Sequence, residues 1–362
     1  MFNTFQDIEK ESWNELVSQN NVNTIFQTYE WNKAWWEIYG EGSSLFIVCV
    51  KDDNKFIGIA PLVIYRGKVK RFLKFIGHGR SDYLDFIYLR GKGKILDLIF
   101  EFIKNKSDEW DEIVLDRIPD YSPTSRSIGE ICHAKGIFCL KYNTRPYVVL
   151  NITDDSGFTY KVQNKKSLIR HRNYFIKQGE YKVYHLTDRN EIMKHMEYFI
   201  KQHIERWGAT RTPSLFTDQK NCNFYKKLLN MADAKWIVFT VVESKELPIA
   251  YHFGFAYNNK FIWYKPSFDI SLFKRSPGEV LLKELLDFAV MNNYHELDFT
   301  IGDEAFKRRF ANKTGEINSY KIFKSNILFW FYSLLGLVKN NINKTKYGNL
   351  IRDCVKHIRE FY

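Results

Sequence analysis

The chain has 362 residues, long enough for two domains that each bury a full hydrophobic core. Hydrophobic residues make up 45% and aromatic residues 17% of it, a composition that excludes a disordered protein. Two segments account for the net charge of +12: residues 161–177 hold six Lys/Arg and no acid, and residues 321–362 hold eight Lys/Arg against two acids. Two basic patches therefore need an explanation.

The five cysteines are scattered without paired spacing. This is typical of a reducing compartment and gives no sign of a disulfide framework or a zinc site. The first residues, MFNTFQDIEKESW, are acidic and polar, unlike a signal or transit peptide. We expect a cytoplasmic protein.

Residues 5–40 read as helices, in which Trp31, Trp35 and Trp36 form a packed aromatic face. Residues 45–50 and 56–65 then alternate around a polar turn, as in a β-hairpin, and residues 236–242 and 248–257 do so again. Five residues of the first hairpin match five of the second at an offset of 190.

Each hairpin is followed by further strand, a helix (95–105 and 280–291) and a short acid-bearing strand (112–116 and 296–299). The simplest account is one α/β unit duplicated within the chain. The second copy has the clearer pattern, with an aromatic strand at 261–264, a polar loop, a helix after Ser276-Pro277-Gly278, and a strand at 297–301. Such a β-α-β unit brings the start of the helix and the polar ends of two strands to one side of a sheet.

The basic segment 161–177 predicts a helix with one thin apolar stripe, which is either a solvated surface or a clamp for phosphate groups. The tail, 326–362, opens with an uncharged run at 327–338 that is too short to span a bilayer. It either packs on the core or lies in an anionic membrane interface beside the basic residues that follow.

At this point the motifs resemble a known family. The resemblance lies in SPG at 276–278 followed by DFTIGDEAFK at 298–307, and in the earlier segments YEWNKAWWEIYG, IGIAPLVI, SDYLDFI and HIERW. The chain resembles the CelD-type acyltransferases of the GNAT superfamily, which are associated with exopolysaccharide and cellulose biosynthesis and are related to the Fem peptidyltransferases. The resemblance covers roughly residues 20–325. It implies an α/β (α+β) fold of two tandem GNAT-like domains, each a mixed, mainly antiparallel sheet flanked by helices: residues 1–155, residues 156–325 with the basic helix 161–177, and then the tail.

The resemblance also implies a thioester donor: an acyl-CoA such as acetyl-CoA, or an acyl carrier protein. One departure matters, because the pyrophosphate loop of GNAT enzymes is glycine-rich, whereas here it has one glycine and a proline that removes a backbone donor. The donor would then be held by side chains, or it is an aminoacyl-tRNA as in Fem enzymes. The candidates for donor binding are Lys274, Arg275, Ser276 and Gly278.

Acyl transfer requires that the nucleophile loses a proton and that the oxyanion is stabilised. Asp298, in a short strand, is a candidate base, and its alternative role is to cap a turn. Glu304 and Lys307 share one helix face if Asp303 caps a helix, and their alternative is an ordinary ion pair. His252 is a candidate base whose alternative is a core histidine.

Acids that interrupt a strand are costly unless they face a cleft, so Asp82 and Asp85 are candidates for the groove between the domains. His203 and Arg206 lie three apart on one helix and suit an anionic acceptor, unless they are surface charges. Arg170 of the basic helix and Asp269 complete the substrate-binding candidates. No metal-binding motif is evident.

The sequence thus predicts an acyltransferase that modifies an amine or hydroxyl of a small-molecule, nucleotide- or lipid-linked glycan precursor, at or near the inner face of the plasma membrane. The basic helix would hold the acceptor's phosphates. One alternative is Fem-like aminoacyl transfer from tRNA to a peptidoglycan precursor. Another is a non-catalytic protein that recruits partners to a membrane.

Overall fold

The computed structural model describes residues 1–327, 329, 330 and 332–334. The chain forms two compact units that are interleaved in sequence. Unit 1 comprises residues 1–22, 40–144 and the part of the chain from 317 on, and unit 2 comprises residues 23–39 and 145–316. This differs from the contiguous domains 1–155 and 156–325 expected from the sequence, because the last strand of unit 1 follows unit 2 in the chain, and residues 23–39 of unit 2 precede the sheet of unit 1.

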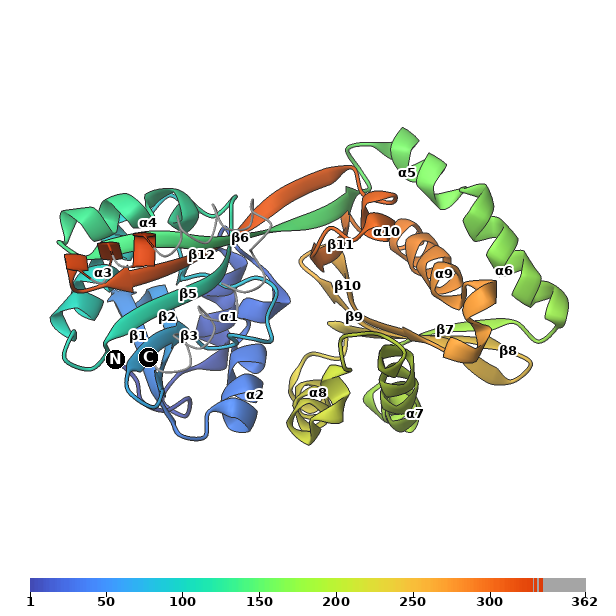
Figure 1. Ribbon diagram of the computed structural model, residues 1–362, viewed down its shortest axis with the longest axis horizontal. Helices are drawn as coiled ribbons and strands as arrows, with labels where there is room; N and C mark the ends of the chain where they lie inside the picture. Colours follow the sequence, from blue (N-terminus) through green and yellow to red (C-terminus); the bar gives the residue numbers. More distant parts are fainter. Residues whose placement is uncertain (328, 331, 335–362) are drawn as a thin grey trace. The chain divides into compact units, whose positions relative to one another are not determined.

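Unit 1 is a mixed sheet with helices on both faces (Figure 1). Its strands follow the order β1-β2-β3-β5-β12, with β4 paired to β2. Helices α3 and α4 bury their apolar sides against one face in a single core cluster. Its elements are α1 (Lys10–Ser18), β1 (Ser43–Asp52), β2 (Lys55–Arg66), β3 (Arg71–Phe75), β4 (Ile87–Tyr88), α3 (Lys94–Asn105), β5 (Glu112–Pro119), α4 (Pro123–Ala134) and the second half of β12 (Lys313–Phe323).

Unit 2 repeats this plan with the strand order β6-β11-β10-β9-β8-β7 (Figure 1). Helices α5, α6 and α9 cover one face of its sheet, and α7 and α8 cover the other. Its strands are the second half of β6 (Phe138–Asn151), β7 (Lys182–Leu186), β8 (Ile237–Ser244), β9 (Leu247–Tyr257), β10 (Lys260–Phe268) and β11 (Glu296–Ile301). Its helices are α2 (Tyr29–Tyr39), α5 (Ser156–Gln163), α6 (Lys166–Gln178), α7 (Arg189–Gly208), α8 (Gln219–Met231), α9 (Pro277–Met291) and α10 (Ala305–Arg308), with 3-10 turns η1 (Ile25–Gln27), η2 (Leu215–Thr217) and η3 (Ile270–Arg275).

The duplication appears as the same order of hairpin, strand, helix and parallel strand in both units. The hairpin turns are Asp53-Asn54 and Lys245-Glu246, all four with positive φ, which is the geometry of a tight two-residue hairpin. These turns are 192 residues apart, so the matches at an offset of 190 are two residues out of structural register. A shift of two keeps every side chain on its own face, which is why the pattern still matched.

The aromatic face expected in the first helices is present. Trp31 is fully buried on α2 and packs edge-on against Phe224 of α8 at 5.1 Å and Phe255 of β9 at 5.8 Å between ring centroids. Trp35 is also buried, whereas Trp36 is half-buried. Helix α2 therefore belongs to the core of unit 2, although it precedes all of unit 1's sheet in the chain.

The basic segment 161–177 is not one helix. Helix α5 ends at Gln163, and α6 begins at Lys166, because the Asn164 side chain caps the end of α5 through the Tyr160 carbonyl and Lys165 is extended. The residues of the tail from 335 on lie outside the described part of the chain, and so does half of the uncharged run at 327–338. None of the described helices is long and apolar enough to cross a membrane.

Candidate functional site

The parallel strands β10 and β11 of unit 2 pair only along their first halves. Residues 260–262 pair with residues 296–298, and the register ends there, although β10 continues to Phe268 and β11 to Ile301. Just beyond this point β10 has a bulge against β9, and β11 has one against β6. The two strands therefore separate after Ile262 and Asp298.

Arg206 of α7 lies at the edge that β10 exposes. Its Nη1 donates to the carbonyl oxygen of Pro266 at 2.7 Å. The Asp269 N–H donates to β9, so the alternation along the strand directs the Pro266 carbonyl away from β9. Pro266 also lacks an N–H for a neighbouring strand. Arg206 thus occupies an edge of β10 with which no strand of the described chain pairs.

The Arg206 guanidinium is short of partners. Its centre lies 4.3 Å from the ring of Phe268 and 5.5 Å from that of Trp207. Burial lowers the pKa of Arg206 to about 10, and no acid in the described part of the chain offsets this effect. Two buried polar atoms on the neighbouring residues in sequence of Arg206 and Pro266, Trp207 Nε1 and Ser267 Oγ, have no hydrogen-bond partner among the described residues. The Arg206 guanidinium is therefore a cation that could pair with an anion.

Phe268 connects this edge to the start of α9. A Cβ on Gly278 would lie 3.1 Å from the Phe268 ring, so the absence of a side chain there allows strand and helix to approach closely. In the first turn of α9, Pro277 has no N–H, and the N–H groups of Glu279 and Val280 donate to the Ser276 carbonyl. The helix start therefore offers few backbone donors for a phosphate.

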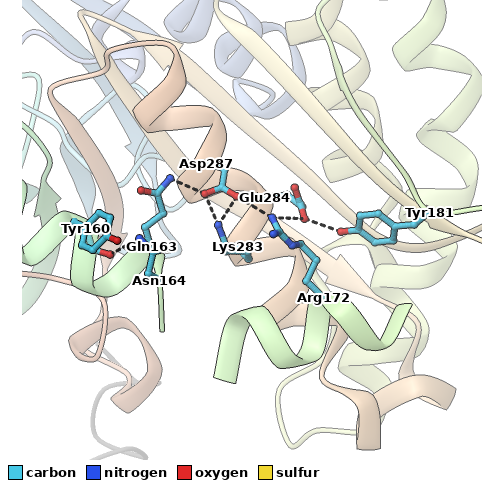
Figure 2. A network of polar contacts seen from close by, with 8 residues as sticks. All are labelled: Tyr160, Gln163, Asn164, Arg172, Tyr181, Lys283, Glu284 and Asp287. Carbon is cyan, nitrogen blue, oxygen red and sulfur yellow. Dashed lines mark hydrogen bonds and ion pairs between the residues drawn. The ribbon is translucent and has the colours of Figure 1, made fainter. Parts of the chain in front are cut away.

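Helix α6 packs along α9 through a network of charged and polar side chains (Figure 2). Arg172 Nη1 lies 3.1 Å from Asp287 Oδ2, and the Tyr181 hydroxyl donates to Glu284 at 2.7 Å. Gln163 and Lys283 also donate to Asp287. The residues drawn are Tyr160, Gln163, Asn164, Arg172, Tyr181, Lys283, Glu284 and Asp287. Part of the basic patch is therefore fixed to acids of α9.

Two further cations lie over aromatic rings: Lys165 of the basic patch, and Arg275, which directly precedes α9. The Arg275 guanidinium lies 4.5 Å from the ring of Tyr174 on α6. Lys165 Nζ lies 5.1 Å from the ring of Phe310. The sequence assigned the basic helix to the acceptor, but its side chains contact the segment predicted to hold the donor.

Residues 163–308, which contain both separating strands and helices α6 to α10, match the family described as an acetyltransferase (GNAT) domain. These residues therefore resemble a GNAT domain. They cover most of unit 2, so the acyltransferase character predicted from the sequence is confirmed at this level. The narrower likeness to CelD-type enzymes stays an expectation.

Solved structures similar to the whole chain include FemX, which is 11% identical over 93% of this chain and 100% of that chain, with a TM-score of 0.66. L-PGS from Bacillus licheniformis is 11% identical over 91% and 96%, with a TM-score of 0.54. A tandem GNAT protein from the clavulanic acid biosynthesis pathway is 9% identical over 90% and 97%, with a TM-score of 0.50. Such low identities show the fold alone. No curated protein sequence gives a match.

The candidate acids of the GNAT domain make internal contacts. Asp298 is buried, and its Oδ1 accepts from the N–H of Thr300, whose φ is +60°. This is the turn-capping role that the sequence left open. Lys307 is also buried, and its Nζ donates to the Ile301 carbonyl at 2.8 Å and forms an ion pair with Glu304 at 2.9 Å. The structure therefore contains the ion pair that was the alternative role of these two residues.

Helix α10 begins at Ala305, with Glu304 and not Asp303 at its N-cap position. The carboxylate of Glu304 folds back over Gly302, where a Cβ would lie 2.6 Å from Oε2. The catalytic roles of Asp298, Glu304 and Lys307 remain predictions.

His252 has a structural position on β9. It is fully buried, and its Nε2 accepts from the N–H of Tyr264, which lies in the bulge of β10. Burial lowers the pKa of His252 to about 3, so the ring is neutral. A neutral ring that fixes the bulge from inside the core is not placed to act as a base.

The remaining candidates in unit 2 fall into two groups. His203 is buried and pairs with Ser214 at 2.8 Å, and Asp269 caps η3 through the N–H of Ser271, so both stabilise the fold. Lys274 and the stacked Arg275 are exposed just before α9, and Arg170 is exposed on α6. Ser276 is half-buried, and its φ of +56° sets the sharp turn into α9.

In unit 1, both acids have partners. Asp82 forms an ion pair with Arg117 at 2.9 Å. Asp85 is buried, accepts from the Phe86 N–H at 2.8 Å and contacts Ser122, the N-cap of α4. Burial raises the pKa of Asp85 to about 7. These contacts hold the loop that follows β3, and they give neither acid a free carboxylate for a substrate.

Sequence reasoning missed Trp207, Ser267 and the exposed edge of β10. One signal was present: Pro266 interrupts an otherwise regular aromatic strand, and a proline inside a strand indicates an edge. Nothing local indicated that Arg206, sixty residues earlier, contacts that edge.

Among the described residues, no group of three His, Cys, Asp or Glu side chains is placed to hold a metal ion.

Proposed function

We propose that this protein transfers an acetyl or larger acyl group from a thioester donor to an amine or hydroxyl of a sugar or glycan precursor used in cell-surface polysaccharide biosynthesis. The observation that supports this proposal most strongly is that β10 and β11 separate within the part of the chain that matches a GNAT domain. A separated parallel pair leaves backbone groups and room for an extended acyl donor, and acyl transfer needs such an orienting surface more than it needs many catalytic side chains.

The donor would be an acyl-CoA or an acyl carrier protein, which supplies the activated thioester carbonyl. The start of α9 presents few free N–H groups, so we propose that side chains hold the donor's phosphates. Arg275 on its Tyr174 ring, with the exposed Lys274 and Arg170, supplies positive charge there. Glu279 does not oppose them fully, because Arg309 lies 3.3 Å from its carboxylate.

The acceptor would carry an anionic group bound by Arg206. A half-buried guanidinium without a carboxylate partner is costly in the free protein, and a ligand phosphate or carboxylate would supply the missing charge. This arrangement favours a nucleotide- or lipid-linked sugar, whose linkage contains phosphate.

A second candidate is Fem-like transfer of an aminoacyl group from tRNA to a peptidoglycan precursor. It is favoured by Arg275 and Lys165, two cations that lie over aromatic rings, because such pairs suit a nucleic-acid backbone and its bases. The third candidate, recruitment to a membrane without catalysis, would use neither Arg206 nor the stacked cations.

Thermal unfolding in the presence of each donor separates the candidates. We expect acetyl-CoA to raise the melting temperature of the wild type and to have little effect on a variant with Arg275→Glu and Arg170→Glu. Stabilisation by aminoacyl-tRNA but not by acetyl-CoA would support the second candidate. If neither donor stabilises the protein, the transferase proposal fails.

A further inference from the structure

The start of the tail is a short helical segment attached to unit 1. Residues 326, 327, 329, 330 and 332–334 are helical, and the Ser325 hydroxyl accepts from the Ile327 N–H at 3.2 Å at the start of the segment. Phe329 packs against Phe138 at 5.8 Å, and Tyr332 stacks on Phe323 at 5.2 Å between ring centroids. One side of the segment is therefore fixed to the β6 and β12 strands.

The opposite side is apolar and exposed. The exposed fractions are 75% for Ile327, 67% for Trp330 and 63% for Leu334. At 100° per residue these three side chains fall within an arc of about 60°, and those of Phe329 and Tyr332 point roughly the other way. The exposed side is therefore one continuous face, whereas most other exposed apolar residues of the described chain come from separate elements.

The chain around this face is basic. Residues 335–362 contain six Lys/Arg and two acids, with Lys339 the first of them after Leu334. Isolated apolar residues on a surface need no explanation, but an apolar helix face with an aromatic residue and an adjoining cationic segment is the combination that binds anionic lipid surfaces. Tryptophan in particular favours the boundary between headgroups and acyl chains.

We propose that Ile327, Trp330 and Leu334 insert together into the headgroup interface of a membrane that contains anionic lipid, with the contacts of Phe329 and Tyr332 holding unit 1 against it. This inference does not depend on the proposed transferase activity. It specifies which side chains enter the interface and which keep the segment on the protein.

Co-sedimentation of the full chain with vesicles tests the proposal. Vesicles of phosphatidylcholine alone are compared with vesicles that also contain phosphatidylglycerol. We expect the wild type to bind the anionic vesicles, and the triple variant Ile327→Gln, Trp330→Gln, Leu334→Gln to partition at least about tenfold more weakly, since three exposed apolar side chains are lost from the contact. Trp330→Gln alone should give a smaller decrease in the same direction.

The matched control is Tyr198→Gln, Leu247→Gln, Met291→Gln, which removes three side chains with exposed fractions of 66%, 68% and 79% from other elements. It should bind as the wild type does. The proposal is overturned if the wild type stays in the supernatant, if the two triple variants bind alike, or if phosphatidylglycerol makes no difference. It is also overturned if sedimentation velocity without lipid shows a dimer that the Ile327, Trp330, Leu334 variant dissociates, since a second copy would then cover the face.

Discussion

Arg206 is the residue on which the acceptor hypothesis depends most. Because it already donates to the Pro266 carbonyl, Arg206→Lys keeps a charge near β10 but loses the planar fork, and Arg206→Ala loses both. For the alanine variant we expect the Michaelis constant for the anionic acceptor to rise by about tenfold to a hundredfold, because one or two charge-assisted hydrogen bonds to the acceptor are lost.

The affinity for the donor serves as the control, since the stacked cations near α9 are untouched. Equal weakening of donor and acceptor binding in Arg206→Ala would mean that the guanidinium supports the fold of β10 and does not contact the acceptor.

His252 makes stability depend on pH. Its pKa is about 3 in the folded protein and about 6.5 in an unfolded chain, so the unfolded state binds the proton and the folded state excludes it. The stabilising effect is complete above pH 6.5 and is lost as the pH falls towards 3, by about 2 kcal/mol at pH 5.

His252→Gln keeps an acceptor for the Tyr264 N–H and removes the titration. Urea unfolding of this variant between pH 7 and 5 should show a pH slope smaller by about one proton, with the exposed His133→Gln as the control. An unchanged slope would show that His252 does not titrate between the two states.

Among the elements, α6 and α9 are held together by charge as well as by apolar packing. Arg172 pairs with Asp287 in a partly buried setting, so Arg172→Met keeps the apolar stem but leaves the acids of α9 with fewer partners. We expect a loss of about 1–3 kcal/mol in the free energy of unfolding. Lys177→Met, at the exposed end of the same helix, should change it by less than about 0.5 kcal/mol. Equal effects would contradict a specific role for the pair.

Most elements could be predicted from the sequence because their signals are local. The apolar spacing of α3 and α9 and the alternation of both hairpins are properties of short windows. The exchange of β6 and β12 between the units was not predictable, since it depends on pairing between strands far apart in the chain. The same reason separates the two parts of the site: the start of α9 was identified from its own sequence, whereas the contact of Arg206 with Pro266 is long-range.

At the scale of the whole molecule, the two units differ where their parallel strands separate. In unit 1 the pairing of β3 with β5 ends at Val114, and the Arg117 carbonyl then accepts from the Leu84 N–H at 2.9 Å. Arg117 has a φ of +68° and pairs with Asp82, so the loop after β3 is bonded to the strand edge that β3 leaves. In unit 2 Arg206 lies at the edge of β10, which is the strand equivalent to β3.

We expect one donor per chain, because in unit 1 the loop after β3 is bonded to the edge of β5 through Leu84 and Asp82. Isothermal titration with acetyl-CoA should give a stoichiometry of one. Arg170→Glu with Arg275→Glu should remove all of the binding heat, since both cations lie near α9. Lys92→Glu with Lys94→Glu, at the start of the equivalent helix α3 in unit 1, is the matched reversal and should leave the heat unchanged. A stoichiometry of two, or a loss of binding heat in the α3 variant, would mean that the loop after β3 moves when a donor binds. Both copies of the duplicated unit would then bind a donor molecule.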